Sequence, residues 1–249
     1  MAQISEREWF RFSWSHQAFL HRITVKIINS LLYRIPFGIK YGIGRLARRN
    51  KAPYSLINGK TAVQIGSPHD TLLAGRSRGM YFSLFVGKEG RAVIIEPEPF
   101  SVETFRKTLK KQGLDSTTVC HNGAWSHAKD LTLYVDHSHP ATNFTSGTVE
   151  YDAKRLADYE AVTVKADSVD NILKQNGIKE VELVSITTNW AEIEILEGME
   201  QLIANGLPYI CLAYGNPGTD YNKLMDGLGY EFHSHDDRGI TFQRKLLAG

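Results

Sequence analysis

An acidic residue and a polar turn each follow a buried segment of this sequence. Glu96 comes directly after the apolar residues 92–95 and before Pro97, and the polar residues 187–190 follow another apolar, strand-like segment. In an α/β sheet, a carboxylate at the carboxyl end of the second strand binds the ribose hydroxyls of a nucleotide. Turns from a strand to a helix at the same edge are where α/β proteins place their chemistry. The two segments therefore predict a nucleoside-containing cofactor beside a polar pocket.

Strands alternate with helices along most of the chain. We predict strands at residues 60–65, 92–95, 116–121, 131–135, 161–164, 181–187 and 209–213, helices at 100–112, 168–175, 191–205 and 221–228, and a terminal hairpin of 230–234 and 240–244. This alternation predicts an α/β fold with a mainly parallel sheet that helices cover on both faces. The terminal hairpin is typical of the methyltransferase version of such folds, in which the last strand inserts antiparallel into the sheet.

Several short motifs follow one another in order between residues 60 and 245. They are Gly66 after the first strand, Glu96-Pro97 after the second, Asn122-Gly123-Ala124 after the third, and then Ile186, Ala191-Glu192, Leu196 and Gly198. In this order they resemble the FkbM-type S-adenosylmethionine-dependent methyltransferases. The resemblance implies a class I methyltransferase Rossmann-like fold, a mostly parallel seven-stranded sheet with a C-terminal antiparallel hairpin. It also implies S-adenosyl-L-methionine as the cofactor.

The chain departs from this family's pattern at two places. The family reads V-D-V-G-A-N-I-G at the first strand, whereas this chain reads V-Q-I-G-S-P-H-D from Val63, so that Gln64 replaces a carboxylate and a longer loop reaches Gly79. The family's later I-D-V-E-G reads I-T-T-N-W from Ile186, without either acidic residue. These substitutions leave a second hypothesis open, a catalytically degenerate binding or scaffold protein of the same fold.

The resemblance implies a cofactor site at the carboxyl ends of the strands. Gly66 and Ser67 would bind the methionine end of the cofactor through backbone groups, because a glycine lets the backbone come close to a ligand. Glu96 would bind the ribose, and Trp125 would either stack on the adenine or belong to the core. The predicted cofactor-binding residues are Gly66, Ser67, His69, Glu96, Pro97, Asn122, Gly123, Ala124, Trp125 and Thr187.

The predicted acceptor site lies in the second polar turn and a histidine-containing loop. Methyl transfer is an in-line displacement at a sulfonium carbon, so the protein must align the acceptor with the methyl group. We predict that Asn189 orients the acceptor and that Trp190 forms its wall. An oxygen nucleophile also needs a base; Glu192 and His139 are the candidates, with Glu192 alternatively stabilising a helix N-terminus. The pair His137 and His139 lacks a third ligand in the sequence, so a solvated loop is favoured and no metal site is predicted.

The first 53 residues contain ten Lys and Arg and two Glu, a formal charge of +8. Apolar residues recur at helical steps over residues 4–34, and a second short basic segment covers residues 39–49. Aromatic and basic residues on one amphipathic helix are typical of an anchor on a membrane surface, and a lid or an arm for homo-oligomerisation is the alternative. We therefore divide the chain into a basic helical extension, residues 1–55, and a methyltransferase domain, residues 56–249.

The composition also bears on the compartment and the partners. Cys120 and Cys211 lie in apolar segments and are expected to be buried free thiols in a reducing compartment. No signal sequence and no membrane-spanning helix are predicted, since Lys26 and Arg34 interrupt the apolar residues 23–43. No nucleic-acid-binding module is recognised. We expect a cytoplasmic enzyme, peripheral on the inner face of the membrane, that O-methylates a lipid-like or glycan-like small molecule.

Overall fold

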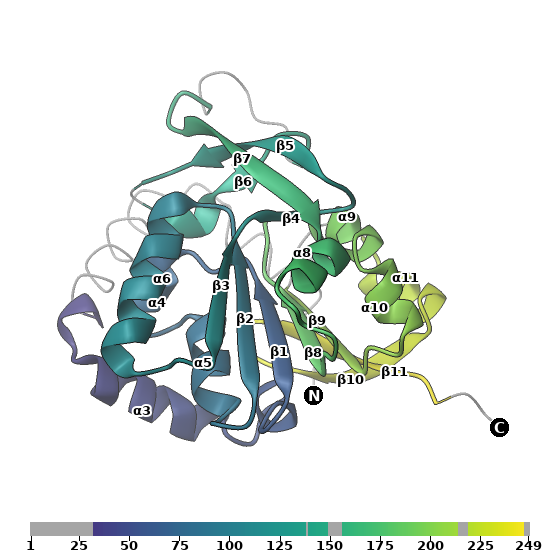
Figure 1. Cartoon of the computed structure of the whole chain (residues 1–249), viewed down its shortest axis with the longest axis horizontal. Coiled ribbons are helices and arrows are strands. Elements are labelled where there is room, and N and C mark those ends of the chain that lie inside the picture. The colour runs from purple at the N-terminus through teal and green to yellow at the C-terminus, as the bar shows by residue number, and fades with distance from the viewer. Residues whose placement is uncertain (1–31, 138, 149–155, 214–218, 247–249) are drawn as a thin grey trace, which may run out of the picture.

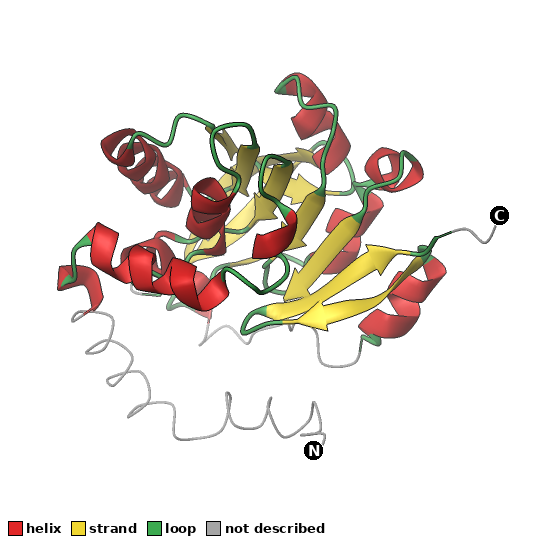
Figure 2. Cartoon of the chain, turned by 90° about the horizontal axis from the view of Figure 1, so that it is seen from below, coloured by secondary structure: helices red, strands yellow, loops and turns green. Residues whose placement is uncertain are grey.

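Figure 1 shows the computed structural model of the chain, which describes residues 32–137, 139–148, 156–213 and 219–246. The helix predicted for residues 4–34 therefore lies almost entirely outside the described residues. A large sheet forms the centre of the molecule, helices cover both of its faces, and a smaller sheet lies at one end (Figures 1 and 2).

Seven strands form the large sheet. They are β1 (Thr61–Ile65), β2 (Arg91–Glu96), β3 (Thr117–His121), β8 (Leu183–Ile186), β9 (Tyr209–Ala213), β10 (Tyr230–His235) and β11 (Gly239–Arg244). Their order is β10-β11-β9-β8-β1-β2-β3. Neighbouring strands are parallel, except that β11 is antiparallel to both β9 and β10. The last strand inserts between two others, which confirms the predicted seven-stranded methyltransferase sheet with a C-terminal hairpin.

Each face of the large sheet has its own hydrophobic core, because successive side chains of a strand point to opposite faces. From β1, Val63 and Ile65 belong to the first core and Ala62 to the second. The helices of the first face are α8 (Val169–Gln175), α9 (Glu192–Glu197), α10 (Glu200–Ala204) and α11 (Tyr221–Gly227). The helices of the second face are α3 (Phe37–Arg48), η1 (Tyr54–Leu56), α4 (His69–Leu73), α5 (Arg78–Phe85) and α6 (Pro99–Gln112).

Four further strands form the smaller sheet at the top of Figure 1. They are β4 (Gly123–Trp125), β5 (Lys129–Val135), β6 (Phe144–Thr145) and β7 (Glu160–Ser168), in the order β4-β7-β5-β6. Leu131, Leu133 and Val135 of β5 are buried and join the first core. The predicted strands at 131–135 and 161–164 lie within β5 and β7, which are longer than predicted. Their place in a separate sheet was not predicted, because alternation of apolar residues does not identify the partner strand.

The single helix predicted for residues 191–205 is wrong, since two short helices occupy that segment. α9 ends at Glu197 and α10 begins at Glu200. Gly198 lies against the backbone of β4, and a Cβ atom on Gly198 would lie 2.0 Å from the carbonyl oxygen of Trp125. The helix ends there because the chain must pass this close to the smaller sheet.

The basic segment predicted at residues 39–49 falls on α3 and its C-cap, Arg49. The helix packs on α5 through Tyr41 and Gly44. Within the described ranges, no helix is both long and apolar enough to cross a lipid bilayer. Cys120 and Cys211 are buried free thiols, as predicted.

Candidate active site

A cavity of about 90 Å³ lies between the two sheets, at the carboxyl ends of β1, β2 and β8. In α/β folds, ligands bind at this edge of the sheet. Seven of the ten predicted cofactor-binding residues line the cavity: Gly66, Glu96, Pro97, Gly123, Ala124, Trp125 and Thr187. Cavities that enclose a drug-sized ligand measure roughly 300–1,000 Å³. The cavity as it stands therefore encloses only part of a cofactor-sized molecule.

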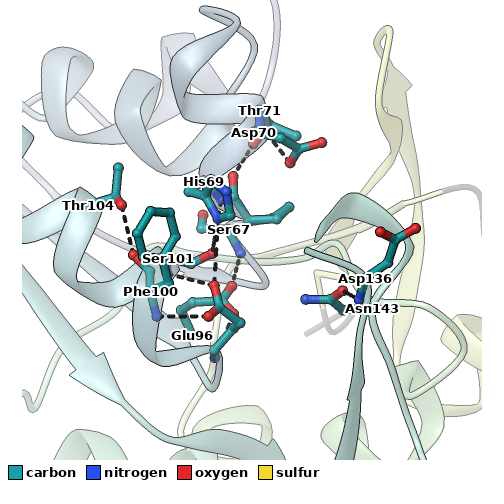
Figure 3. Close-up of polar contacts among 12 residues, drawn as sticks. Ser67, His69, Asp70, Thr71, Glu96, Phe100, Ser101, Thr104, Asp136 and Asn143 are labelled. Atoms are coloured by element: carbon teal, nitrogen blue, oxygen red, sulfur yellow. Dashed lines mark hydrogen bonds and ion pairs between the residues drawn. The ribbon is translucent and has the colours of Figure 1, made fainter. Parts of the chain in front are cut away.

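Glu96 is the last residue of β2 and lines this cavity, and the residue is only 5% exposed. One oxygen accepts a hydrogen bond from the backbone N–H of Ser67 at 2.5 Å, and the other accepts one from the N–H of Glu98 at 3.0 Å (Figure 3). Burial raises the pKa of Glu96 to about 7, although these two hydrogen bonds act in the opposite direction. Glu96 therefore joins the loop after β1 to the end of β2.

Beside Glu96, a second carboxylate organises the start of α6. Glu98 accepts hydrogen bonds from the N–H groups of Phe100 at 2.7 Å and Ser101 at 2.6 Å, which makes it the N-cap of the helix. Burial alone would raise the pKa of Glu98, but hydrogen bonds from His69, Ser101 and Phe100 lower it to about 2. His69 Nδ1 lies 3.1 Å from Ser101 Oγ and 3.6 Å from Glu98. His69 thus belongs to this cap and does not line the cavity, and Ser67 does not line it either.

Gly66 and Thr187, which follow β1 and β8, lie in close contact. Gly66 has a φ of +78°, and a Cβ atom on it would lie 2.3 Å from the carbonyl oxygen of Thr187. Gln64 donates its amide hydrogens to the carbonyl oxygens of Ile65 at 2.8 Å and Gly66 at 2.9 Å, and its nitrogen also lies 2.6 Å from Thr187 Oγ1. An ionised carboxylate cannot donate such bonds. Gln64 therefore makes hydrogen bonds that a carboxylate at this position could not make, and they connect the ends of β1 and β8.

The opposite wall of the cavity is apolar and comes from the smaller sheet. Trp125 is 7% exposed and lines the cavity, and the Lys129 ammonium lies 5.2 Å from its ring centroid. Asn122 does not line the cavity. Four apolar wall residues were not predicted: Leu131, Leu133, Phe144 and Val164. The alternation of apolar residues in 131–135 predicted a strand with one buried face, but gave no sign that this face lines a cavity.

Two of the predicted catalytic residues are connected with the loop in front of β6: Asn189 bonds to it, and His139 belongs to it. The short helix η2 (Pro140–Thr142) lies in that loop, and Pro140, Ala141 and Asn143 line the cavity. The Asn189 amide donates hydrogen bonds to the carbonyl oxygens of Ala141 at 3.0 Å and Asn143 at 2.7 Å. His139 Nδ1 lies 3.3 Å from the buried carboxylate of Asp70 on α4. Both side chains fix the loop over the cavity. That Asn189 orients an acceptor and that His139 acts as a base stay predictions.

The other two predicted catalytic residues, Trp190 and Glu192, lie beside the cavity and do not line it. Trp190 has a φ of +70°, which no other non-glycine residue of the described ranges shares; such strained residues cluster at functional sites. Glu192 is 1% exposed and accepts hydrogen bonds from Thr188 Oγ1 at 3.0 Å and Tyr221 OH at 3.5 Å. Burial raises the pKa of Glu192. Since Thr188 does line the cavity, its hydroxyl group connects the Glu192 carboxylate to the cavity.

The histidine pair of the same loop forms no metal-binding group in the part of the chain that the structure describes. His137 Nε2 lies 2.6 Å from Glu160 at the surface, and His139 faces Asp70.

The raised pKa of Glu96 predicts a pH dependence of stability. In the folded chain this carboxyl keeps its proton up to about pH 7, whereas the ordinary value is 4.5. Its contribution to the free energy of unfolding is therefore full below pH 4.5 and is lost as the pH rises through 7, about 3 kcal/mol in all. Urea unfolding at about pH 5 and about pH 8 should show this loss in the native chain and a smaller one in Glu96→Gln. Equal losses in both proteins would contradict the assignment.

Asn189→Ala is expected to loosen the loop without unfolding the protein. Removing the two amide hydrogen bonds costs roughly 1–2 kcal/mol locally, so the N–H groups of Thr142 and Asn143 should exchange with solvent about tenfold faster. Hydrogen exchange measured by mass spectrometry checks this. Asn176→Ala is the matched control, because Asn176 donates its amide to the carbonyl oxygen of Ile172 at 2.8 Å, far from this loop in the sequence. Unchanged exchange in Asn189→Ala would show that other contacts fix the loop.

No family model matches the chain, and no curated protein matches it in sequence. Its structure is similar to the crystal structure of methyltransferase FkbM from Methylobacillus flagellatus KT, with a TM-score of 0.50 and 14% sequence identity. That match covers 78% of this chain and 47% of the other, so the chain spans about half the length of that methyltransferase. This likeness confirms the predicted resemblance at the level of the fold.

Two further solved structures match with lower TM-scores. A methyltransferase from Geobacter sulfurreducens has a TM-score of 0.44 and 11% identity, over 99% of this chain and 98% of that one. A SAM-dependent O-methyltransferase from Thermotoga maritima has a TM-score of 0.38 and 8% identity, over 86% of this chain and 68% of that one.

Proposed function

We propose that the protein is an S-adenosylmethionine-dependent methyltransferase. The observation that carries the proposal is that Gly66, Glu96 and Trp125, from three separate segments, line one cavity at the carboxyl edge of a methyltransferase sheet. Glu96 is a buried carboxylate, suited to accept hydrogen bonds from ribose hydroxyls, and Trp125 offers an aromatic face for a purine. These residue types fit the adenosine part of the cofactor.

The strand ends and the apolar wall of the cavity would have different roles in methyl transfer. The bound cofactor would supply a methyl group on a cationic sulfur. Gly66 and Thr187 bring the backbone of β1 and β8 to the cofactor, and the apolar residues Leu131, Leu133 and Phe144 exclude water from it. Exclusion of water and alignment of the acceptor are the main contributions that a protein makes to such a displacement.

The acceptor that we propose is a hydroxyl group of a lipid-like or glycan-like small molecule at a membrane surface. An oxygen acceptor needs a base, and Glu192 has the raised pKa that suits this task. Its hydrogen bond from Thr188 connects it to the cavity, so Thr188 Oγ1 could pass the proton on. Asn189 would orient the acceptor once its loop has moved.

The test of this proposal is turnover. The protein is incubated with S-adenosylmethionine and a panel of lipid and glycan alcohols, and S-adenosylhomocysteine and methylated acceptor are measured by mass spectrometry. Acceptor-dependent formation of both products supports the proposal, and Glu192→Gln should then lower the rate about 100-fold or more. If no acceptor of either class is methylated although the cofactor binds, the proposed acceptor is wrong.

A second candidate function is binding without catalysis, as in a degenerate methyltransferase that serves as a scaffold. One observation favours it: of the described residues that line the cavity, only Glu96 is ionisable, and both of its oxygens already accept backbone hydrogen bonds. Binding of S-adenosylhomocysteine without turnover of any acceptor would support this candidate.

A further inference from the structure

Helix α3 has apolar side chains on two opposite sides. On its inner side, Tyr41 is buried, and a Cβ atom on Gly44 would lie 1.7 Å from the hydroxyl of Tyr81, so the helix packs closely on α5. On its outer side, Ile39, Ile43 and Leu46 are 55%, 65% and 67% exposed. Their spacing of four and three residues places them in one stripe along the helix. A contiguous exposed apolar stripe of this kind marks an interaction surface.

Cations border this stripe, and no acidic residue lies near it in the sequence. Arg34, Arg45, Arg49 and Lys51 are exposed, and residues 9–69 contain no Asp or Glu. The other two cations of the segment turn inward: Lys40 donates to the carbonyl oxygen of Leu73, and Arg48 Nη2 lies 2.8 Å from Asp237. Arg45 reaches over the ring of Phe85 on α5, with its guanidinium 5.7 Å from the ring centroid. Three exposed cations, Arg34, Arg49 and Lys51, therefore border α3 at its two ends.

We propose that the outer side of α3 binds an anionic lipid bilayer. Ile39, Ile43 and Leu46 would enter the boundary between headgroups and acyl chains, and the exposed cations at the two ends of α3 would contact lipid phosphates. Helices that lie in a membrane surface combine an apolar stripe with Lys and Arg in this way, and each basic residue near an anionic bilayer adds to the attraction. The proposal deepens the membrane part of the proposed function and rests on that part alone.

Besides a bilayer, a second copy of the chain or residues 1–31 of the same chain could cover the outer side of α3, and the charges of these three candidates distinguish them. A second copy of the chain, related by a two-fold axis, would bring two sets of the same cations together without any acidic partner on α3. Residues 1–31 of the chain contain four basic and two acidic residues, so this segment also carries a net positive charge. An anionic lipid surface is the occupant whose charge is complementary.

The surface and the cavity lie apart and can be tested separately. Figure 1 shows α3 at the lower edge of the molecule and the smaller sheet at its upper edge, with the large sheet between them. Substitutions on the outer side of α3 should therefore leave the binding of S-adenosylhomocysteine unchanged. A failure of vesicle binding and a failure of cofactor binding are thus distinguishable.

Vesicle flotation of the full chain tests the proposal, with vesicles of phosphatidylcholine alone and of phosphatidylcholine with phosphatidylglycerol. Binding should require the anionic lipid, and Ile43→Asp should weaken it by about tenfold or more. Phe232→Asp is the matched control, because Phe232 is 55% exposed on β10 and the charge change is the same. The proposal is overturned if Ile43→Asp binds like the native chain, or if the control loses as much affinity.

A fluorescent label on α3 reports what covers it. A Cβ atom on Gly42 would have no other atom within 4 Å, and both native cysteines are buried, so Gly42→Cys can be labelled selectively with an environment-sensitive dye. A blue shift only with anionic vesicles supports the proposal. A blue shift without vesicles overturns it, and its dependence on protein concentration then separates a second copy from residues 1–31 of the same chain.

Discussion

Glu96→Ala is expected to weaken the binding of S-adenosylhomocysteine by tenfold or more, about 1.4 kcal/mol or above. The variant removes the only ionisable group among the described cavity-lining residues. It also releases the N–H of Ser67, which lies 2.5 Å from the carboxylate, so the loop after β1 loses its connection to β2. Isothermal titration calorimetry on the native chain and the variant measures the effect.

Glu98→Ala is the control for this prediction. Glu98 is the neighbouring buried carboxylate, and it caps α6 without lining the cavity. Loss of the cap should lower the free energy of unfolding by about 1 kcal/mol and leave the ligand affinity unchanged. If Glu96→Ala binds as tightly as the native chain, or if both variants lose affinity equally, Glu96 has no specific part in the site.

Gly66→Ala is expected to destabilise the protein most, by about 3–5 kcal/mol. Alanine at a φ of +78° is strained, and its Cβ atom would lie 2.3 Å from the carbonyl oxygen of Thr187. The ends of β1 and β8 would have to separate, which breaks the hydrogen bonds of Gln64 and Thr187 to the carbonyl oxygen of Gly66. Urea unfolding measures the change in the free energy of unfolding, which equals the shift of the urea midpoint multiplied by the slope m if m is the same in both proteins.

Gly59→Ala separates the two causes of this loss. Gly59 also has a positive φ, +70°, but apart from Gly59 and its two chain neighbours no atom lies within 4 Å of its Cβ position. Backbone strain alone should cost about 1–2 kcal/mol there. A loss in Gly66→Ala no larger than in Gly59→Ala would show that β1 and β8 do not meet as closely as the structure has them.

The positions of the strands of the large sheet were predictable because their signals are local, whereas their arrangement in one sheet was implied by the resemblance to a known family. Each strand is an apolar run bounded by turn residues, and Glu96-Pro97 and Gly66 mark the ends of two of them. The hairpin at residues 230–244 fixed the position of the last strand. The smaller sheet was not predictable in the same way, since β4 has three residues and β6 has two, and β5 pairs with β7 across a long connection.

The cofactor side of the site was more predictable than the acceptor side. Gly66 and Thr187 directly follow strands and Glu96 ends one, so the topology alone brings them to one edge of the sheet. The contacts of Asn189 and His139 are both distant in sequence. Asn189 bonds to Ala141 across 48 positions, and His139 faces Asp70 on α4. No local pattern shows such a contact, and polar residues that fix a loop look the same in sequence as residues that bind an acceptor.

The measurement that most directly tests the central claim is a calorimetric titration of the purified chain with S-adenosylmethionine and with S-adenosylhomocysteine. NADH serves as the control, because it shares the adenosine but not the amino-acid tail. Both adenosyl-sulfur ligands should bind with a Kd on the order of 10 μM, about −7 kcal/mol, and NADH should not bind. No binding of either ligand, or equal binding of NADH, would contradict the claim that this cavity is a methyl-donor site.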